Sequence, residues 1–333
     1  MQRWERHAIT YDDGEARTAE LETIPDRSRT ILAENDSPDV GFRYSVNPYR
    51  GCYHGCAYCY ARPSHEYLSL GAGTDFERRI VYKPEAAALL REAFDAPRWR
   101  GELVAFSGVT DCYQPLESRL GLTRACLEVC AEYKNPVAVI TKSPLVERDV
   151  DVLADLATRA RARVAVSIPF AREEHARALE PFVTTPARRL RTIERLAAAG
   201  VPVGVSVSPV VPGLSDDGIP DVLRRAADAG ASFAFYVVLR LPGPVREVFE
   251  ARLREALPLR ADRVLARLRD VFDGKLYDAR FGARQAGSGP YARAIEALFA
   301  RAAERHGLRH GEASYVDVGE TTFARPRGQL SLF

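Results

Sequence analysis

Three cysteines stand close together early in the chain, in a pattern suited to an iron–sulfur cluster. Cys52, Cys56 and Cys59 follow one another with C-x3-C-x2-C spacing. Three thiolates can hold three corners of a [4Fe-4S] cube, whereas structural clusters and zinc sites normally close their coordination with a fourth residue. The spacing therefore predicts a cluster in which one iron has no protein ligand. Such an iron can bind a small molecule and reduce it.

A zinc site is the alternative for the same cysteines, with His54 or His65 as the fourth ligand. Zinc ribbons pair two C-x2-C units across a longer gap, and the sequence contains no second unit of this kind. Gly51 and Gly55 would let the chain turn tightly around a cube. The pattern favours the cluster, with the two histidines as packing or supporting residues.

The elements that position this motif show a regular alternation from about residue 42 onward. Apolar or β-branched segments predict strands at 42–46, 103–106, 137–140, 163–168, 201–207 and 232–238. Helical patterns lie between them at 84–94, 122–133, 145–160, 186–199 and 219–229, and Gly200 and Gly230 follow two of these. Alternating strands and helices indicate parallel strands joined by right-handed crossovers. We therefore predict an α/β fold, a partial (β/α)6 TIM-like barrel with its site at the C-terminal strand ends.

The chain divides into four predicted regions. Residues 1–41 form an N-terminal arm, which is expected to be irregular because it is polar and rich in turn signals. Residues 42–243 form the barrel. Residues 244–324 form a C-terminal helical region packed on the barrel, with two or three helices and a glycine-rich break at 282–289. Residues 325–333 form a flexible tail.

The cysteine motif, with Tyr58 just before its last cysteine, resembles the signature of the radical S-adenosylmethionine (SAM) enzymes. The resemblance implies that SAM binds at the open iron, with Tyr58 against the adenine. SAM carries an amino group, a carboxylate, a ribose and an adenine, so its pocket needs short polar groups and a cation. Residues after the predicted strands supply them, and the expected contacts are Ser107, Gly108, Thr110, Asp111, Lys142 and Ser167. Lys142 is expected to pair with the SAM carboxylate. Asp111 either accepts from the amino group or caps the next turn.

Further segments resemble the spore photoproduct lyase-like branch, and more narrowly a bacterial subgroup whose members mostly lack an assigned substrate. They include 37–39, 47–52, 60–68, 110–117, 141–143, 180–181 and 209–216. The resemblance implies one [4Fe-4S] cluster and reductive cleavage of SAM to a 5'-deoxyadenosyl radical. It also implies flavodoxin or ferredoxin as electron donor. In spore photoproduct lyase the radical abstracts hydrogen from a thymine dimer lesion and reverses it.

The remaining cysteines depart from the lyase pattern. The lyase has a hydrogen-donating cysteine just before its Thr-Ser-Asp segment, where this chain has Val109, and Cys112 follows two residues after Thr110. Cys112 is a candidate for that role from a shifted position, and a buried packing residue is the alternative. Cys126 and Cys130 share one face of a predicted helix and are expected in the core, without a second cluster.

The final residues predict a partner. Residues 329–333, which are Gln329, Leu330, Ser331, Leu332 and Phe333, resemble the pentapeptide by which bacterial repair and replication proteins dock on the DNA sliding clamp. An extended peptide can place a leucine and a phenylalanine in apolar pockets while a glutamine makes a polar contact. Packing of the tail on the barrel is the alternative.

Composition limits the class of protein. The chain has 333 residues, a net charge of +2, 46% hydrophobic and 28% charged residues, which is typical of a globular protein and gives no global nucleic-acid signal. It contains no apolar stretch long enough for a membrane helix and no apolar leader segment. Bunched cysteines favour ligation in a reducing compartment, so we expect a cytoplasmic protein. Arginine-rich stretches are expected to be solvated helix faces.

The leading interpretation is a radical SAM enzyme, lyase-like or hydrogen-abstracting, that acts on nucleic acid, such as a DNA lesion or a modified base. One alternative keeps the chemistry and changes the substrate to tRNA, a peptide or a metabolite. Another is a DNA-maintenance adaptor with a structural iron–sulfur cluster.

Overall fold

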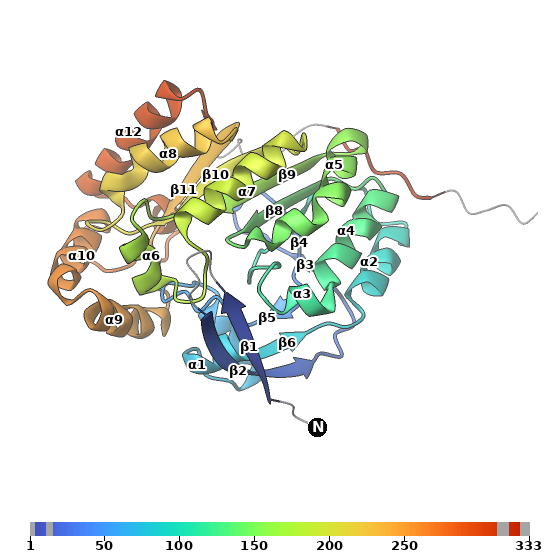
Figure 1. Ribbon diagram of the computed structural model, residues 1–333, viewed down its shortest axis with the longest axis horizontal. Helices are drawn as coiled ribbons and strands as arrows, with labels where there is room; N and C mark the ends of the chain where they lie inside the picture. Colours follow the sequence, from blue (N-terminus) through green and yellow to red (C-terminus); the bar gives the residue numbers. More distant parts are fainter. Residues whose placement is uncertain (1–3, 11–15, 312–319, 327–333) are drawn as a thin grey trace, which may run out of the picture.

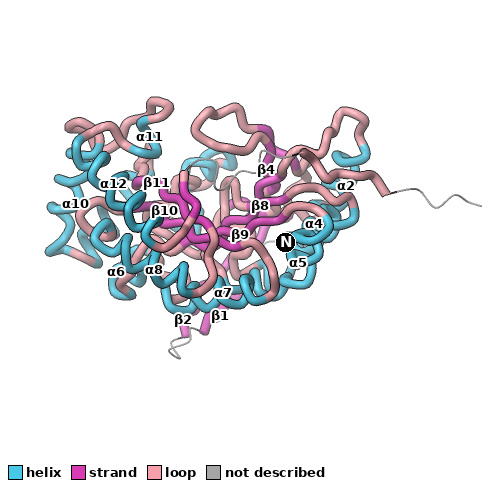
Figure 2. The backbone as a smooth tube through the Cα atoms, turned by 90° about the horizontal axis from the view of Figure 1, so that it is seen from above, coloured by secondary structure: helices cyan, strands magenta, loops and turns pink. Residues whose placement is uncertain are grey.

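An eight-stranded sheet forms the centre of the molecule. The structure is a computed structural model that describes residues 4–10, 16–311 and 320–326. The sheet is an open, partial barrel with strand order β12-β11-β10-β9-β8-β7-β4-β3 (Figures 1 and 2). Six neighbouring strands are parallel: β4 (Tyr44–Val46), β7 (Val104–Phe106), β8 (Val137–Thr141), β9 (Ala162–Ser167), β10 (Val203–Val210) and β11 (Phe233–Val238). At the edges, β3 (Leu32–Glu34) runs antiparallel to β4, and β12 (Arg309–His310) runs parallel to β11.

Each of the six predicted strands is confirmed, together with the α/β fold. Their sequences are almost continuously apolar because both faces of a parallel sheet are covered. In β8, for example, Val137, Ala138 and Val139 are at most 1% exposed although their side chains alternate between the two faces.

The predicted helices lie between consecutive strands. They are α2 (Ala86–Asp95), α4 (Leu122–Glu132), α5 (Val150–Arg159), α7 (Pro186–Ala198) and α8 (Ile219–Asp228), with shorter α3 (Glu117–Leu120) and α6 (Glu173–Leu179). Gly200 and Gly230 follow α7 and α8 with φ of 77° and 95°, a left-handed conformation that ends a helix at little cost for glycine. The C-terminal region contributes α9 (Val245–Ala256), α10 (Pro258–Val271), α11 (Ala283–Ala286) and α12 (Pro290–Arg305).

The expectation of an irregular N-terminal arm is wrong for much of its length. β1 (Trp4–Thr10) and β2 (Ala16–Pro25) form a hairpin, and β2 continues a second sheet through β6 (Arg79–Tyr82) to β5 (Tyr49–Arg50). A buried Leu21 anchors β2. The strand lacks an alternating apolar pattern, so sequence periodicity did not reveal it.

The two ends of the open sheet are tied together by a polar contact. Arg284 of α11 donates to Asp39, which precedes β4, at 2.5 Å, and the backbone N–H of Gly282 donates to the same carboxylate at 2.7 Å. α11 packs on β11 at one end of the sheet, while residues 37–42 connect β3 to β4 at the other. The bond therefore joins segments that stand at opposite ends of the strand order (Figure 2).

Residues 320–326 form a short strap against the outside of the barrel. Phe323 stacks on Tyr133, with ring centres 6.0 Å apart. Arg325, which the sequence assigned to the flexible tail, donates to the carbonyls of Phe94 at 3.1 Å and Ala96 at 2.8 Å. These partners end α2 or follow α4, at the N-terminal side of β7 and β8. The strap thus lies on the face opposite the C-terminal strand ends. The division into four regions stays a prediction, and residues 327–333 lie outside the described part.

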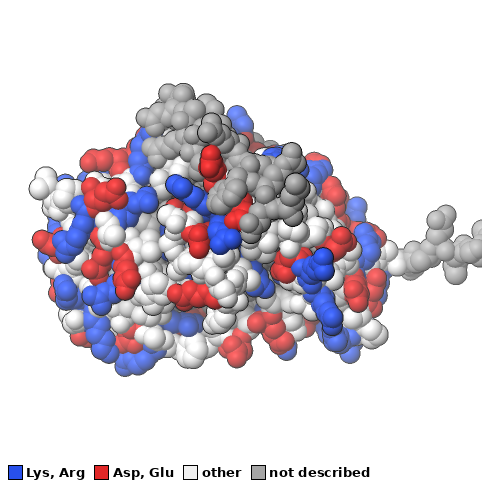
Figure 3. Space-filling view, turned by 90° about the horizontal axis from the view of Figure 1, so that it is seen from below, with Lys and Arg blue, Asp and Glu red and all other residues white. Residues whose placement is uncertain are grey.

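The surface charges are mixed. On the face shown in Figure 3, acidic and basic side chains are interspersed. Helix pairs such as Arg224–Asp228 and Arg177–Glu173 explain this mixture, since residues four apart lie side by side. Within the described residues, no helix is both long and apolar enough to span a bilayer.

Candidate active site at the mouth of the barrel

The cysteine loop lies at the C-terminal end of β4. The chain leaves β4, pairs briefly as β5 with the second sheet, and turns at Gly51, whose φ is 80°. A side chain at Gly51 would meet His65 at 2.8 Å and the Phe76 carbonyl at 2.9 Å, so this turn requires glycine. The backbone N–H of Cys52 donates to the Phe76 carbonyl at 2.9 Å. The loop is therefore fixed against the second sheet as well as the barrel.

A buried arginine organises the loop from inside. Arg62, at the start of η1 (Arg62–Leu68), has no exposed surface and donates to the carbonyls of Cys56 at 2.8 Å and Ala72 at 2.9 Å. It also pairs with the buried Glu77 at 2.5 Å. From the other side, Gln114 donates to the Gly51 carbonyl at 3.0 Å. These long-range bonds hold the loop backbone without any contribution from the cysteine thiols.

The three thiols have the chemistry that a cluster needs. Cys52 and Cys56 are buried and Cys59 is partly exposed, so one side of the loop is open. Burial raises the pKa of each thiol, and a bound cation is therefore needed to keep all three as thiolates. Among the described residues, no three His, Cys, Asp or Glu side chains converge on a point where one metal ion would sit. A cube takes each thiolate on a different iron, so this spread fits a cluster better than a single zinc ion.

The two histidines have other partners. His65 is buried, its Nε2 lies 2.9 Å from the Arg79 carbonyl, and its ring packs edge-on against Phe76. His54 Nδ1 lies 3.4 Å from Asp111. Both therefore support the loop through contacts away from the thiols.

Lys142 belongs to a buried charge network that sequence reasoning did not assemble. Its ammonium lies 3.4 Å from Glu180, 3.3 Å from the Ser208 carbonyl and 5.7 Å from the ring centre of Tyr58. Glu180 also pairs with the fully buried Arg189 at 2.6 Å and accepts a hydrogen bond from the Tyr58 hydroxyl.

The electrostatics of this network leave a positive charge near the cysteine loop. Burial alone raises the pKa of Glu180, but Arg189 and Lys142 outweigh it and lower that pKa below the ordinary value. Glu180 is therefore ionised, and two cations face one carboxylate. The surplus charge is on Lys142, which is 14% exposed, while Arg189 is sealed inside.

The segment after β7 is held in an unusual conformation. Ser107 has a φ of 73°, which is uncommon for a residue with a side chain, and its hydroxyl accepts from the Cys112 N–H at 2.9 Å. A side chain at Gly108 would meet Ser45 at 2.8 Å. Thr110 donates to the Tyr49 carbonyl at 2.8 Å, linking this segment to β5.

Asp111 is occupied by protein donors. It accepts from the backbone of Tyr113 at 2.9 Å, the hydroxyl of Thr141 at 2.7 Å and the backbone of Lys142 at 2.7 Å. Burial opposes its charge, but these bonds and His54 lower its pKa. Asp111 thus caps the turn and joins the tips of β7 and β8. Its contact with SAM stays a prediction.

The other predicted residues differ in depth. Ser167, at the end of β9, is 5% exposed, and its carbonyl accepts from Arg189 at 2.8 Å. Cys112 is 1% exposed within the main core, and burial raises its pKa well above the usual range. Cys126 and Cys130 lie fully buried in α4. A hydrogen-donating role for Cys112 stays a prediction.

Four residues of this region were not singled out from the sequence: Arg62, Gln114, Glu180 and Arg189. Glu180 and Arg189 do fall in or beside short segments that resemble the lyase branch. Nothing in the local pattern distinguishes a buried arginine from the many surface arginines of this chain.

Comparison with known proteins agrees with this site. The profile of the radical SAM superfamily matches residues 46–226. A protein of Mycobacterium tuberculosis described as uncharacterized is 39% identical over 233 residues, which are 69% of this chain and 67% of that protein. An uncharacterized protein of Methanocaldococcus jannaschii is 27% identical over 182 residues, 55% of this chain and 66% of its own length.

Solved structures show a similar fold. Spore photoproduct lyase complexed with dinucleoside spore photoproduct superposes with a TM-score of 0.63 at 17% identity, covering 86% of this chain and 81% of the lyase. A double mutant of the lyase with bound AdoMet and the same dinucleoside gives 0.63 at 17% identity, covering 89% and 82%. The superfamily is one that uses SAM and a [4Fe-4S] cluster. With a profile match over more than half its length, this chain belongs to the radical SAM superfamily and is a radical SAM enzyme.

Proposed function

We propose that Cys52, Cys56 and Cys59 hold a [4Fe-4S] cluster and that SAM binds at its open iron. When bound and reduced, this group supplies the electron that cleaves SAM to a 5'-deoxyadenosyl radical, which takes hydrogen from a substrate at the barrel mouth. Flavodoxin or ferredoxin supplies the electron to the cluster. The observation that carries the proposal is the surplus positive charge of Lys142 beside the loop.

The residues around the loop have distinct tasks in this proposal. Lys142 attracts the SAM carboxylate, while Glu180 and Arg189 hold its ammonium in place. Tyr58 presents its ring to the adenine, and the short side chains after the strands supply polar contacts to the amino group and ribose; these are Ser107, Gly108, Thr110, Asp111 and Ser167. The strained Ser107 and the close approach at Gly108 give that segment one fixed shape, which favours a preorganised pocket.

We propose nucleic acid as the substrate, with a damaged or modified base as the reacting group. Support comes from the fold, which is shared with a lyase solved in complex with a dinucleoside lesion. Tyr60, next to the last cysteine, is 45% exposed and offers an aromatic face on which a base can stack.

Lys142→Ala is expected to weaken SAM binding by about tenfold to a hundredfold, because a charge-assisted hydrogen bond contributes about 1.5 to 3 kcal/mol. Equilibrium dialysis of the reconstituted protein measures this. Lys134→Ala is the matched control, since Lys134 is exposed beyond the other end of β8. Equal SAM affinity in the two variants would contradict the assignment of Lys142.

The same preparation tests the reaction. Reduced protein, SAM and deuterated single-stranded DNA are incubated without oxygen, and 5'-deoxyadenosine is analysed for label. Deuterium in 5'-deoxyadenosine is the expected result. Unlabelled 5'-deoxyadenosine would reject DNA as substrate, and no 5'-deoxyadenosine at all would favour an adaptor with a structural cluster.

We further propose that residues 329–333 bind the DNA sliding clamp. The supporting observation is the strap, since Arg325 and Phe323 fix the preceding residues on the face away from the mouth. Surface plasmon resonance with immobilised clamp should show binding by the full chain and a loss of at least about tenfold after removal of 329–333. Equal binding by both proteins would end this proposal.

A further inference from the structure

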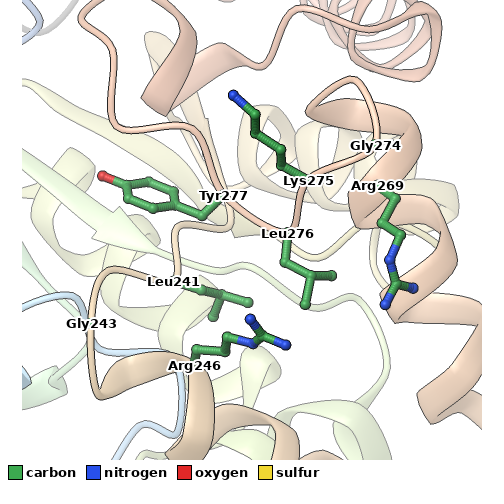
Figure 4. Close-up of a pocket in the computed structure, with 8 residues that line it drawn as sticks. All are labelled: Leu241, Gly243, Arg246, Arg269, Gly274, Lys275, Leu276 and Tyr277. Carbon is green, nitrogen blue, oxygen red and sulfur yellow. The ribbon is translucent and has the colours of Figure 1, made fainter.

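A second cavity lies beside the mouth, between the end of β11 and the helices α9 and α10. Its volume is about 470 Å³, and its lining includes Leu241, Arg246, Arg269, Lys275 and Leu276 (Figure 4). Figure 4 shows the guanidinium groups of Arg246 and Arg269 extending toward the same space beside Leu276, whereas Lys275 points elsewhere. No carboxylate is among the described residues that line it. The cavity is therefore cationic with an apolar wall.

The two arginines are weakly engaged within the protein. Arg246 pairs with Glu250 of its own helix at 2.8 Å, a surface contact with Arg246 56% exposed. The hydrogen bond described for Arg269 is a long one, 3.4 Å, to the carbonyl of Leu265 in its own turn. Surface ion pairs of this kind contribute little and rearrange readily. Both guanidinium groups can therefore turn to a ligand without breaking the fold.

The cavity is connected to the candidate active site through neighbouring residues. Arg240 precedes the cavity residue Leu241 and lies 4.8 Å from the ring centre of Tyr60. Tyr60 follows Cys59 and donates to the Gly108 carbonyl at 2.8 Å. An extended ligand can therefore contact the Tyr60 ring, Arg240 and the cavity in succession.

We propose that this cavity binds a phosphate of the nucleic acid strand whose reacting base lies in the barrel mouth. The inference rests on the proposed function and names how its substrate is held. Two guanidinium forks from separate helices match the oxygens of a phosphodiester, and guanidinium groups bind phosphate in a bidentate way. The volume exceeds that of one phosphate, and the wall formed by Leu241 and Leu276 suits the adjoining sugar.

The test uses the double variant Arg246→Gln/Arg269→Gln in the full chain. A fluorescently labelled single-stranded DNA 12-mer is titrated and its anisotropy recorded at several salt concentrations. We expect binding to weaken by about tenfold or more, and the slope of log affinity against log salt to fall by about 1.4, because each phosphate contact to a single strand contributes about 0.7. The matched control is Arg254→Gln/Arg260→Gln, which removes the same charge from exposed positions toward the other ends of α9 and α10.

The outcomes separate this inference from the reaction. Wild-type affinity and slope in the double variant would overturn the cavity's role, as would a control variant that loses just as much. Inorganic phosphate provides a second arm: phosphate binding that depends on Arg246 and Arg269 while strand binding does not would assign the cavity to a free anion and overturn the proposal. SAM cleavage without substrate is measured in parallel. Its retention in the double variant means that a change in strand binding does not report loss of the cluster.

Discussion

Alanine at Cys52, Cys56 or Cys59 is expected to abolish formation of 5'-deoxyadenosine. Each thiolate is proposed to hold a different iron, so its loss leaves a corner of the cube without a ligand and the cluster incomplete or absent. Iron content after anaerobic reconstitution should fall from about four per chain to well below that value. Iron analysis and chromatography of the products measure the two effects.

The fold should survive these changes, because the loop is held by backbone bonds and by Arg62 rather than by the thiols. Cys130→Ala is the matched control: this cysteine is fully buried in α4 and should leave both iron content and cleavage unchanged. Cleavage that persists in Cys56→Ala would overturn the ligand assignment. An iron content near eight per chain in the wild type would reveal a second cluster.

Arg62→Ala is expected to cause the largest loss of stability, about 3 to 5 kcal/mol in the free energy of unfolding. The change leaves Glu77 buried without its partner and leaves the carbonyls of Cys56 and Ala72 without their donor. Urea unfolding of the metal-free protein, followed by circular dichroism, measures the loss, because a bound cluster would add its own stabilisation.

Two further variants sharpen this measurement. Arg91→Ala removes an arginine from an exposed pair with Glu132, whose side chains are 45% and 40% exposed, and should cost less than about 1 kcal/mol. Arg62→Ala combined with Glu77→Ala should recover part of the loss, because no buried charge is then left unpaired. A cost for Arg62→Ala no larger than that for Arg91→Ala would show that the loop does not depend on this residue.

The barrel was predictable because its signals are local. Each parallel strand is a short apolar run, and glycines such as Gly200 and Gly230 mark where helices end. The second sheet was not predictable in this way. β2 is mostly polar and is stabilised by pairing with β6, more than fifty residues later, so its own sequence contains little of the information.

The same contrast applies to the site. The cysteines form one short motif, and Lys142 follows an apolar strand, so both could be identified from neighbouring residues. Glu180 contacts Tyr58 across 122 positions, and Arg62 contacts Glu77 across 15. Such partners depend on how the chain returns to the mouth, which periodicity does not encode. Burial of an arginine likewise depends on tertiary packing and has no signature in its neighbours.

The strap formed by residues 320–326 limits how far any protein bound to residues 329–333 can stand from the barrel. A fully extended chain covers at most about 3.3 to 3.6 Å per residue, so residues 327–333 reach no more than about 25 Å beyond Pro326. Because the strap is fixed at the N-terminal side of β7 and β8, that reach begins behind the enzyme. A tethered copy would be held by its back with the mouth turned outward, free to sweep the strand that passes its partner.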